Sequence, residues 1–97
     1  MGITVIVELR AKTGRRAELA EVLERIVGHE GARAPGFLGS TRYEVLDDPD
    51  RLVEIADWES AEARATHMQE SASSGAYAPI MEILAEPPRA TIIQRLS

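Results

Sequence analysis

Apolar residues follow two different periods along this chain, and the order of those periods restricts the fold. Over residues 3–10, Ile, Val and Leu recur at every second position, which is the period of a β-strand with one buried face. The segment that follows has helical spacing, with apolar residues at Leu19, Val22, Leu23, Ile26 and Val27. We therefore expect a strand and then a helix that is capped by Thr13 and ends near Gly28.

The rest of the chain continues this alternation of periods. The expected elements are, in order, strands at 37–46 and 51–58, a helix capped by Ser60 that ends near Gln69, a helix around residues 77–84 and a strand at 90–95. An Asp-rich turn at residues 47–50 joins the two central strands, and a polar break at residues 71–75 separates the two helices. Pro87 and Pro88 end the second of these helices.

The resulting order, β-α-β-β-α-β, is that of the ferredoxin-like split βαβ motif. It predicts an α+β fold in which four strands form one antiparallel sheet and the helices cover one of its faces. A chain of 97 residues is expected to be a single domain, residues 1–97, with only a modest core of its own.

The opposite face of the predicted sheet also carries apolar residues. Val53 and Ile55 alternate with Glu54 and therefore lie on the other face of their strand. The neighbouring strand is expected to place on one side Phe37, Thr41, Tyr43 and Val45. Two copies of the chain could bury such a face by packing their sheets together, which predicts a homodimer. The alternative is that these residues are scattered over a half-solvated sheet.

Composition argues against several classes of function. The net charge of −5 and the scattered Lys and Arg residues disfavour nucleic-acid binding. Without cysteine the chain forms no disulfide, thiolate nucleophile or iron–sulfur site, which agrees with the cytoplasm. Two histidines are too few for a His-rich metal site, and His29 is expected on the surface at a helix end. No apolar run can span a membrane, and no signal peptide is visible.

Several segments of the chain resemble the antibiotic biosynthesis monooxygenase family. The signature region of that family is similar to Asp48-Pro49-Asp50-Arg51-Leu52-Val53 followed by Trp58-Glu59-Ser60-Ala61-Glu62-Ala63 and His67. Residues 3–12 with Gly14 resemble its first strand and turn, residues 35–39 resemble the entry to its second strand, and residues 84–88 resemble its end. The segments occur in the family's order and together cover nearly the whole chain.

The resemblance implies a fold, an assembly and a chemistry. It implies a dimeric α/β barrel made of two such sheets, with a pocket in each subunit between the sheet and its helices. Members of the family include oxygenases that convert polycyclic phenols or anthrones to quinones with molecular oxygen and with no metal or flavin cofactor. Relatives include quinol monooxygenases and haem-degrading enzymes.

The chain departs from the family at three positions. Ala56 stands where the family usually has Glu, and Glu54 stands where several polyketide-modifying members have Asn. Val7 matches the position of an Asn in haem-degrading relatives, and the whole chain contains no Asn. Val7 disfavours haem degradation. Ala56 and Glu54 change the polar group that oxygenases of the family usually have in the site.

Three residues are the candidates for catalysis: Glu54, His67 and Trp58. Glu54 shares a face with Trp58, and a carboxylate on an apolar, pocket-side face becomes a better proton acceptor because burial raises its pKa. The alternative for Glu54 is an ion pair with Arg42. His67 could bind a phenolic oxygen or take its proton, or it could form a hydrogen bond at the edge of the core. Trp58 offers an apolar wall, or anchors the helix that follows.

The candidates for substrate binding are Val7, Arg42, Tyr43, Tyr77 and Met81. Arg42 and Tyr43 lie on opposite sides of their strand, so one of the two is expected to face the pocket, and which one is left open. Tyr77 and Met81 have helical spacing and could equally belong to the core.

These observations predict a cofactor-independent monooxygenase. Its substrates would be molecular oxygen and a polycyclic phenol, anthrone or quinol, which it would oxidise to a quinone in aromatic polyketide metabolism. The alternatives are a polyketide cyclase or isomerase on the same fold, and a dimer that binds a small molecule without catalysis. Oxygen consumption would separate the first two functions, and a pocket too small for a tricyclic ligand would favour the third.

Overall fold

The computed structural model of the protein describes residues 2–30 and 33–96. Its four strands are β1 (Ile3–Arg10), β2 (Phe37–Glu44), β3 (Arg51–Trp58) and β4 (Arg89–Ile93). They form one sheet in the order β2-β3-β1-β4, in which every neighbouring pair is antiparallel. This arrangement confirms the predicted α+β, ferredoxin-like fold.

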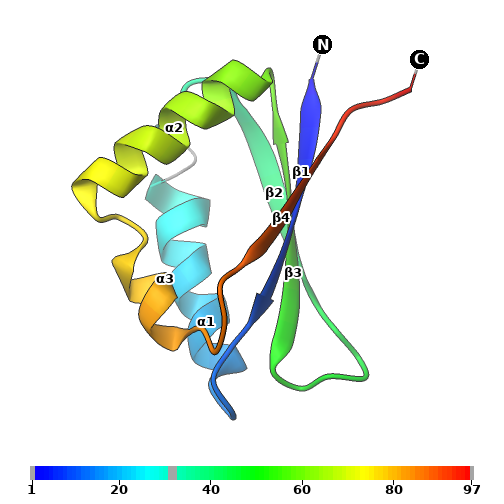
Figure 1. The fold of residues 1–97 in the computed structure, drawn as a ribbon, viewed down its shortest axis with the longest axis vertical. Helices are drawn as coiled ribbons and strands as arrows, with labels where there is room; N and C mark the ends of the chain where they lie inside the picture. The colour runs from blue at the N-terminus through cyan, green and yellow to red at the C-terminus, as the bar shows by residue number, and fades with distance from the viewer. Residues whose placement is uncertain (1, 31–32, 97) are drawn as a thin grey trace.

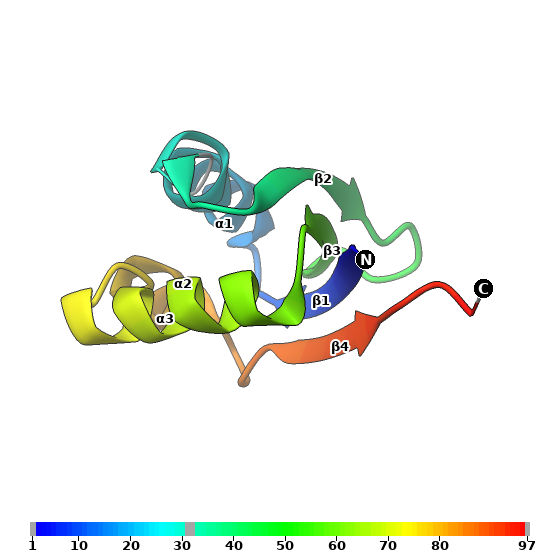
Figure 2. The same cartoon turned by 90° about the horizontal axis from the view of Figure 1, so that it is seen from above.

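The helices lie together on one face of the sheet, and no helix of the described residues lies on the other face (Figure 1). They are α1 (Arg16–Leu23), which continues as a π-helical segment η1 (Glu24–Glu30), then α2 (Ala61–Ser74) and α3 (Ala78–Ile83). Viewed from above in Figure 2, α1 lies on the side of β2, while α2 and α3 lie on the side of β4. The surface position expected for His29 lies outside what the structure describes.

The two strands in which apolar and polar residues alternate most clearly have the predicted bounds, whereas the helices begin or end at other residues than predicted. β1 and β3 begin and end where the sequence predicts. Ser60 caps α2 as expected, since its Oγ accepts a hydrogen bond of 3.1 Å from the amide of Ala63. Thr13 does not cap α1, which begins three residues later, at Arg16. The polar break expected at residues 71–75 is wrong, because α2 runs through its serines and ends only at Gly75.

A β-bulge near the start of β2 changes which side chains face the helices. Phe37 pairs with Trp58, but it is Gly39 that pairs with the next residue of β3, Asp57. The extra residue reverses the alternation, so Phe37 faces the helices and its ring packs edge-on to Trp58 at 5.1 Å between centroids. The expectation that Phe37 shares a side with Thr41 and Tyr43 is therefore wrong.

The core between the helices and the sheet consists of two clusters. The larger one joins α1, η1 and α3 to one end of the sheet and includes Leu9, Leu19, Val22, Leu23, Ile26, Leu52, Ile80 and Ile83. The smaller one lies at the other end and contains Ile3, Val5, Ala56 and Trp58. Val7 packs against both clusters and thus lies where they meet.

The outer face of the sheet carries apolar side chains that no described helix covers. Ile6 and Ile55 pair directly across β1 and β3, and Val53 pairs with Tyr43 on the neighbouring strand. Tyr43 is 51% exposed and Ile93 on β4 is 44% exposed. We call this set of five residues the outer apolar face.

The start of α2 lies against Gly36, and this contact can be tested. A Cβ at Gly36 would lie 2.6 Å from the Cβ of Ala63, in a backbone with a φ of 86°. Gly14 has a similar φ of 78° but nothing within 4 Å of a Cβ. Gly14→Ala should therefore lower the free energy of unfolding only by the cost of the left-handed conformation, about 1–2 kcal/mol. Gly36→Ala should lose about 1–3 kcal/mol more because of the overlap.

The measurement is the free energy of unfolding of both variants in urea. Equal losses for Gly14→Ala and Gly36→Ala would show that α2 does not depend on the close approach at Gly36.

Candidate functional site

Helix α2 faces the sheet with small and polar side chains. Ala63, His67 and Ser71 follow one another at four-residue spacing and point inward, and Ser71 is buried. Helix α1 presents Leu19, Val22 and Leu23 instead, all of them buried. Because the inner side chains of α2 do not fill the space above the sheet, a pocket remains between them.

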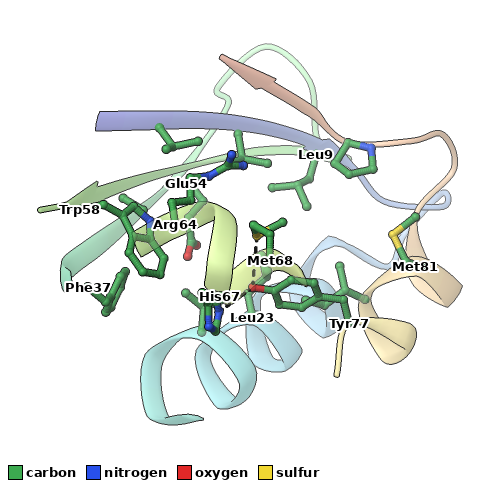
Figure 3. Close-up of a pocket in the computed structure, with 16 residues that line it drawn as sticks. Leu9, Leu23, Phe37, Glu54, Trp58, Arg64, His67, Met68, Tyr77 and Met81 are labelled. Atoms are coloured by element: carbon green, nitrogen blue, oxygen red, sulfur yellow. Dashed lines mark hydrogen bonds between the residues drawn. The ribbon is translucent and has the colours of Figure 1, made fainter. Parts of the chain in front are cut away.

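This pocket has a volume of about 150 Å³ and opens to solvent. Sixteen residues line it: Val5, Val7, Leu9, Leu23, Val27, Phe37, Glu54, Ala56, Trp58, Arg64, His67, Met68, Tyr77, Ile80, Met81 and Pro88. Figure 3 shows Phe37 and Trp58 toward one end, Met81 toward the other, and Tyr77 between them. An enclosed apolar cavity of about this volume accommodates a benzene ring. A ligand with several rings would therefore extend through the mouth.

Glu54 is a buried carboxylate in the wall of this pocket. It lies on β3, is 5% exposed, and pairs across the sheet with Arg42 of β2. An Arg42 guanidinium nitrogen lies 3.2 Å from a carboxylate oxygen of Glu54, and the same guanidinium also forms an ion pair with Glu24. The ion pair considered for Glu54 thus exists, and the carboxylate lines the pocket as well.

Burial is the main influence on the protonation of Glu54. Removal from water raises the pKa of this carboxyl, and the charge and hydrogen bond of Arg42, with a hydrogen bond from Ser40, act in the opposite direction. Since burial prevails, Glu54 is more easily protonated than an exposed glutamate. A carboxylate with a raised pKa is a stronger proton acceptor in its ionised form.

His67 forms a second polar group in the pocket wall. Its Nε2 lies 3.0 Å from the Tyr77 hydroxyl and 3.4 Å from Oγ of Ser71. Its ring lies 5.3 Å from the ring of Trp58, measured between centroids. Tyr77 also contacts Met68, with its hydroxyl 3.8 Å from the sulfur. The imidazole is therefore held between an aromatic wall and a phenol.

Burial shifts the protonation of both members of this pair. It lowers the pKa of His67, against the charge of Glu70, so the neutral imidazole is favoured. It also raises the pKa of Tyr77, which the hydrogen bond with Ser71 and the charge of Arg64 partly offset, while the charge of Glu54 adds to the rise. A neutral imidazole and a protonated phenol are the forms that share one hydrogen bond.

The predicted site residues divide into two groups. Six of them line the pocket: Val7, Glu54, Trp58, His67, Tyr77 and Met81. Arg42 and Tyr43 do not. The sheet register explains this, because Arg42 pairs with Glu54 and faces the helix side, while Tyr43 pairs with Val53 on the outer apolar face. Arg42 therefore reaches the pocket only through its ion pair.

Sequence reasoning missed ten of the sixteen lining residues, among them Phe37, Arg64 and Met68, and it also missed Ser71, which lies 3.4 Å from His67. Arg64 precedes His67 by three positions and Ser71 follows it by four, so helical spacing from His67 would have found both. Phe37 was misplaced because the bulge in β2 was not predicted, although Gly39 within the strand is a signal of one. Among the described residues, no group of three His, Asp or Glu side chains is placed to hold a metal ion.

A family model described as antibiotic biosynthesis monooxygenase matches residues 2–78 of the chain. The chain belongs to this family. The resemblance inferred from the segments around Asp48 and Trp58 is thereby confirmed. No curated protein matches the chain.

Solved structures of the family share the fold. A Bordetella bronchiseptica protein that carries the family's name has a TM-score of 0.85 at 23% identity, with 99% of this chain and 98% of that chain covered. SnoaB of Streptomyces nogalater, a cofactor-independent oxygenase, has a TM-score of 0.84 at 19% identity, with 99% and 94% covered. At such low identity the similarity establishes the fold and not the substrate. In the part of the chain that the structure covers, no helix has the length and hydropathy to cross a membrane.

The raised pKa of Glu54 predicts how stability depends on pH. The folded protein holds this proton more tightly than the unfolded chain, whose carboxyl has the ordinary pKa of 4.5. The protonated carboxyl of Glu54 therefore adds to the free energy of unfolding below pH 4.5, and this contribution is lost as the pH rises through the raised pKa. Glu54→Gln cannot ionise and should not show this decline.

The measurement is urea unfolding of the wild type and Glu54→Gln between about pH 4 and pH 8. His67 has a lowered pKa and the opposite pH dependence, but it is common to both proteins, so their difference isolates Glu54. Glu21→Gln, which alters an exposed carboxyl, is the control. A constant difference between Glu54→Gln and wild type across this range would contradict the burial of a titrating Glu54.

Proposed function

We propose that this protein oxidises a phenol, anthrone or quinol to a quinone with molecular oxygen and without a cofactor. One observation carries the proposal: a carboxylate and an imidazole line the same apolar pocket, at Glu54 and His67. The family supports an oxygenase, and SnoaB is an oxygenase of the cofactor-independent kind. A polycyclic substrate from aromatic polyketide metabolism is our proposal for the natural substrate.

The chemistry that such a pocket would support starts with proton removal. A base takes a proton from the substrate, and the electron-rich anion that results reacts directly with oxygen. For an anthrone, the two C–H bonds of the reacting carbon supply the four electrons that reduce O₂. One oxygen atom becomes the carbonyl of the quinone and the other leaves as water, so no outside reductant is needed.

Glu54 is the proposed base. Its position in an apolar wall raises its pKa, and Arg42 holds the carboxylate in place on the strand. A base whose pKa lies close to the operating pH is the most effective in proton transfer. The ion pair with Arg42 and the proton transfer are compatible, because Arg42 contacts the carboxylate without lining the pocket.

His67 and Tyr77 are the proposed partners of the substrate oxygen. The neutral imidazole can accept a proton or a hydrogen bond, and the Tyr77 hydroxyl can donate one. Trp58 provides a flat wall beside His67, against which an aromatic ring can stack. Apart from Arg64, the remaining lining is apolar, which limits the access of water to the reacting carbon and orients the ring.

Turnover of Glu54→Gln tests this assignment. With 1,8-dihydroxyanthrone as substrate, Glu54→Gln should lose about a hundred- to ten-thousandfold in rate, the usual contribution of a general base. His67→Ala should lose less if His67 only positions the substrate. The measurements are oxygen consumption and quinone absorbance above the background without enzyme, together with the melting temperature of each variant.

Glu21→Gln is the control, because it removes an exposed carboxylate that does not line the pocket. Full activity of Glu54→Gln would refute Glu54 as the base and leave its ion pair as a purely structural feature. Product formation without oxygen consumption would indicate a cyclase or isomerase, and binding without turnover would indicate a binding protein.

We further propose that the protein acts in the cytoplasm as a homodimer in which the outer apolar faces pack together. Ile6, Val53 and Ile55 lie at the centre of that face, and Tyr43 and Ile93 are large side chains left exposed on it. A second copy would bury them, and a closed two-fold pair is the commonest arrangement. The absence of cysteine agrees with the cytoplasm.

Placement of a charge on the outer apolar face tests the dimer. Sedimentation of the wild type at micromolar concentration should give the mass of two chains, and Ile55→Glu should give the mass of one because a buried carboxylate has no partner there. Ala65→Glu puts the same charge on the exposed side of α2 and should remain dimeric. A monomeric wild type would refute the proposal.

A further inference from the structure

Arg64 is the one positively charged side chain among the residues that line the pocket. It lies on α2, three residues before His67, and is partly buried. In the view of Figure 3 it is drawn toward the end of the pocket that carries Trp58. Arg64 lines the same pocket as Tyr77, and its charge acts to lower the pKa of the Tyr77 hydroxyl.

Within the part of the chain that the structure describes, no ion pair of Arg64 occurs at 4.0 Å or less. Two other basic residues on the helix side of the sheet are paired: Arg42 with Glu54 and Glu24, and Arg16 with Glu44. Glu54 is the carboxylate in the pocket wall, and its ion pair with Arg42 already satisfies it. Arg64 therefore faces an apolar pocket with its charge uncompensated.

An uncompensated charge at an apolar surface is costly, and the cost falls when an anion binds beside it. Guanidinium is the group best suited to carboxylates and related oxyanions, because its planar array of donors forms paired hydrogen bonds. A neutral ligand would leave this charge as it is, and a cationic ligand would be repelled. The pocket thus discriminates among aromatic ligands by charge.

We propose that Arg64 binds an oxyanion carried by the aromatic ligand, either a carboxylate substituent or the phenolate that forms when a phenol loses its proton. The inference rests on the proposed function only in taking this pocket as the ligand site. It adds the chemical class of the ligand, an aromatic oxyanion. It also separates two tasks, since Glu54 would accept the proton while Arg64 holds the negative charge.

Calorimetric binding of 2-naphthoate and 2-naphthamide tests the carboxylate. The two ligands have nearly the same shape and differ in charge. The wild type should prefer 2-naphthoate by about ten- to a hundredfold, as expected for a charge-assisted hydrogen bond. Arg64→Gln should lose this preference and bind 2-naphthamide as the wild type does. Arg64→Lys should keep a part of it.

A coloured phenol, 4-nitro-1-naphthol, tests the phenolate. If Arg64 binds the phenolate, the pKa of the bound phenol, followed by its absorbance, should be lower in the wild type than in Arg64→Gln. A naphthoate preference without this difference would assign Arg64 to a carboxylate substituent, and the reverse result would assign it to the phenolate. Arg25→Gln, which removes the same charge from an exposed site, should behave like the wild type in both assays.

Three results would overturn the inference. The first is equal affinity for 2-naphthoate and 2-naphthamide in the wild type together with an unchanged pKa of the bound phenol. The second is a preference for the anion that persists in Arg64→Gln, and the third is no binding of any of these ligands. None of the measurements involves oxygen or turnover, so a failed oxygenase assay and a failed binding assay remain distinct.

Discussion

Helix α2 meets the sheet with alanine, histidine and serine, whereas α1 meets it with leucine and valine. Large apolar side chains on α2 would have filled the space above β3 and left no pocket. The helix is instead held at its start by the Ser60 cap and the contact with Gly36, and at its middle by the hydrogen bond between His67 and Tyr77. This helix lies over β3 and shields Glu54 and His67 from most of the solvent. Its small inner side chains leave a pocket beside these two residues.

The same desolvation acts in opposite directions on the two groups. It raises the pKa of Glu54 and lowers the pKa of His67, so the two values approach each other. For each group, removal from water favours the neutral form relative to the same group in water. Arg42 limits the shift of Glu54, since its removal would leave a buried carboxylate without a partner. The protonation behaviour of the site therefore follows from where the helix lies and from one ion pair.

The sequence predicts those parts of the structure in which a single period dominates. β1 and β3 have their predicted bounds because alternation of apolar and polar residues is strong in both. Gly39 within the predicted strand suggests a bulge, but the exact register shift between Phe37 and Gly39 depends on how β2 fits against its neighbour. The polar end of α2, from Ser71 to Ser74, has the composition of a break but is helical in its tertiary context. Two of the pocket residues that were missed, Arg64 and Met68, lie on this polar helix, where no apolar period marks the inner face.

Trp58 is the only tryptophan of the chain, and it lies in the pocket wall between Phe37 and His67. All the indole fluorescence of the protein therefore arises from one position, 5% exposed and directly beside the imidazole. A protonated imidazole quenches a neighbouring indole by electron transfer, whereas the neutral ring does so much less. The emission of the unlabelled protein is thus an optical signal of the charge on His67 and of any quencher that enters beside it.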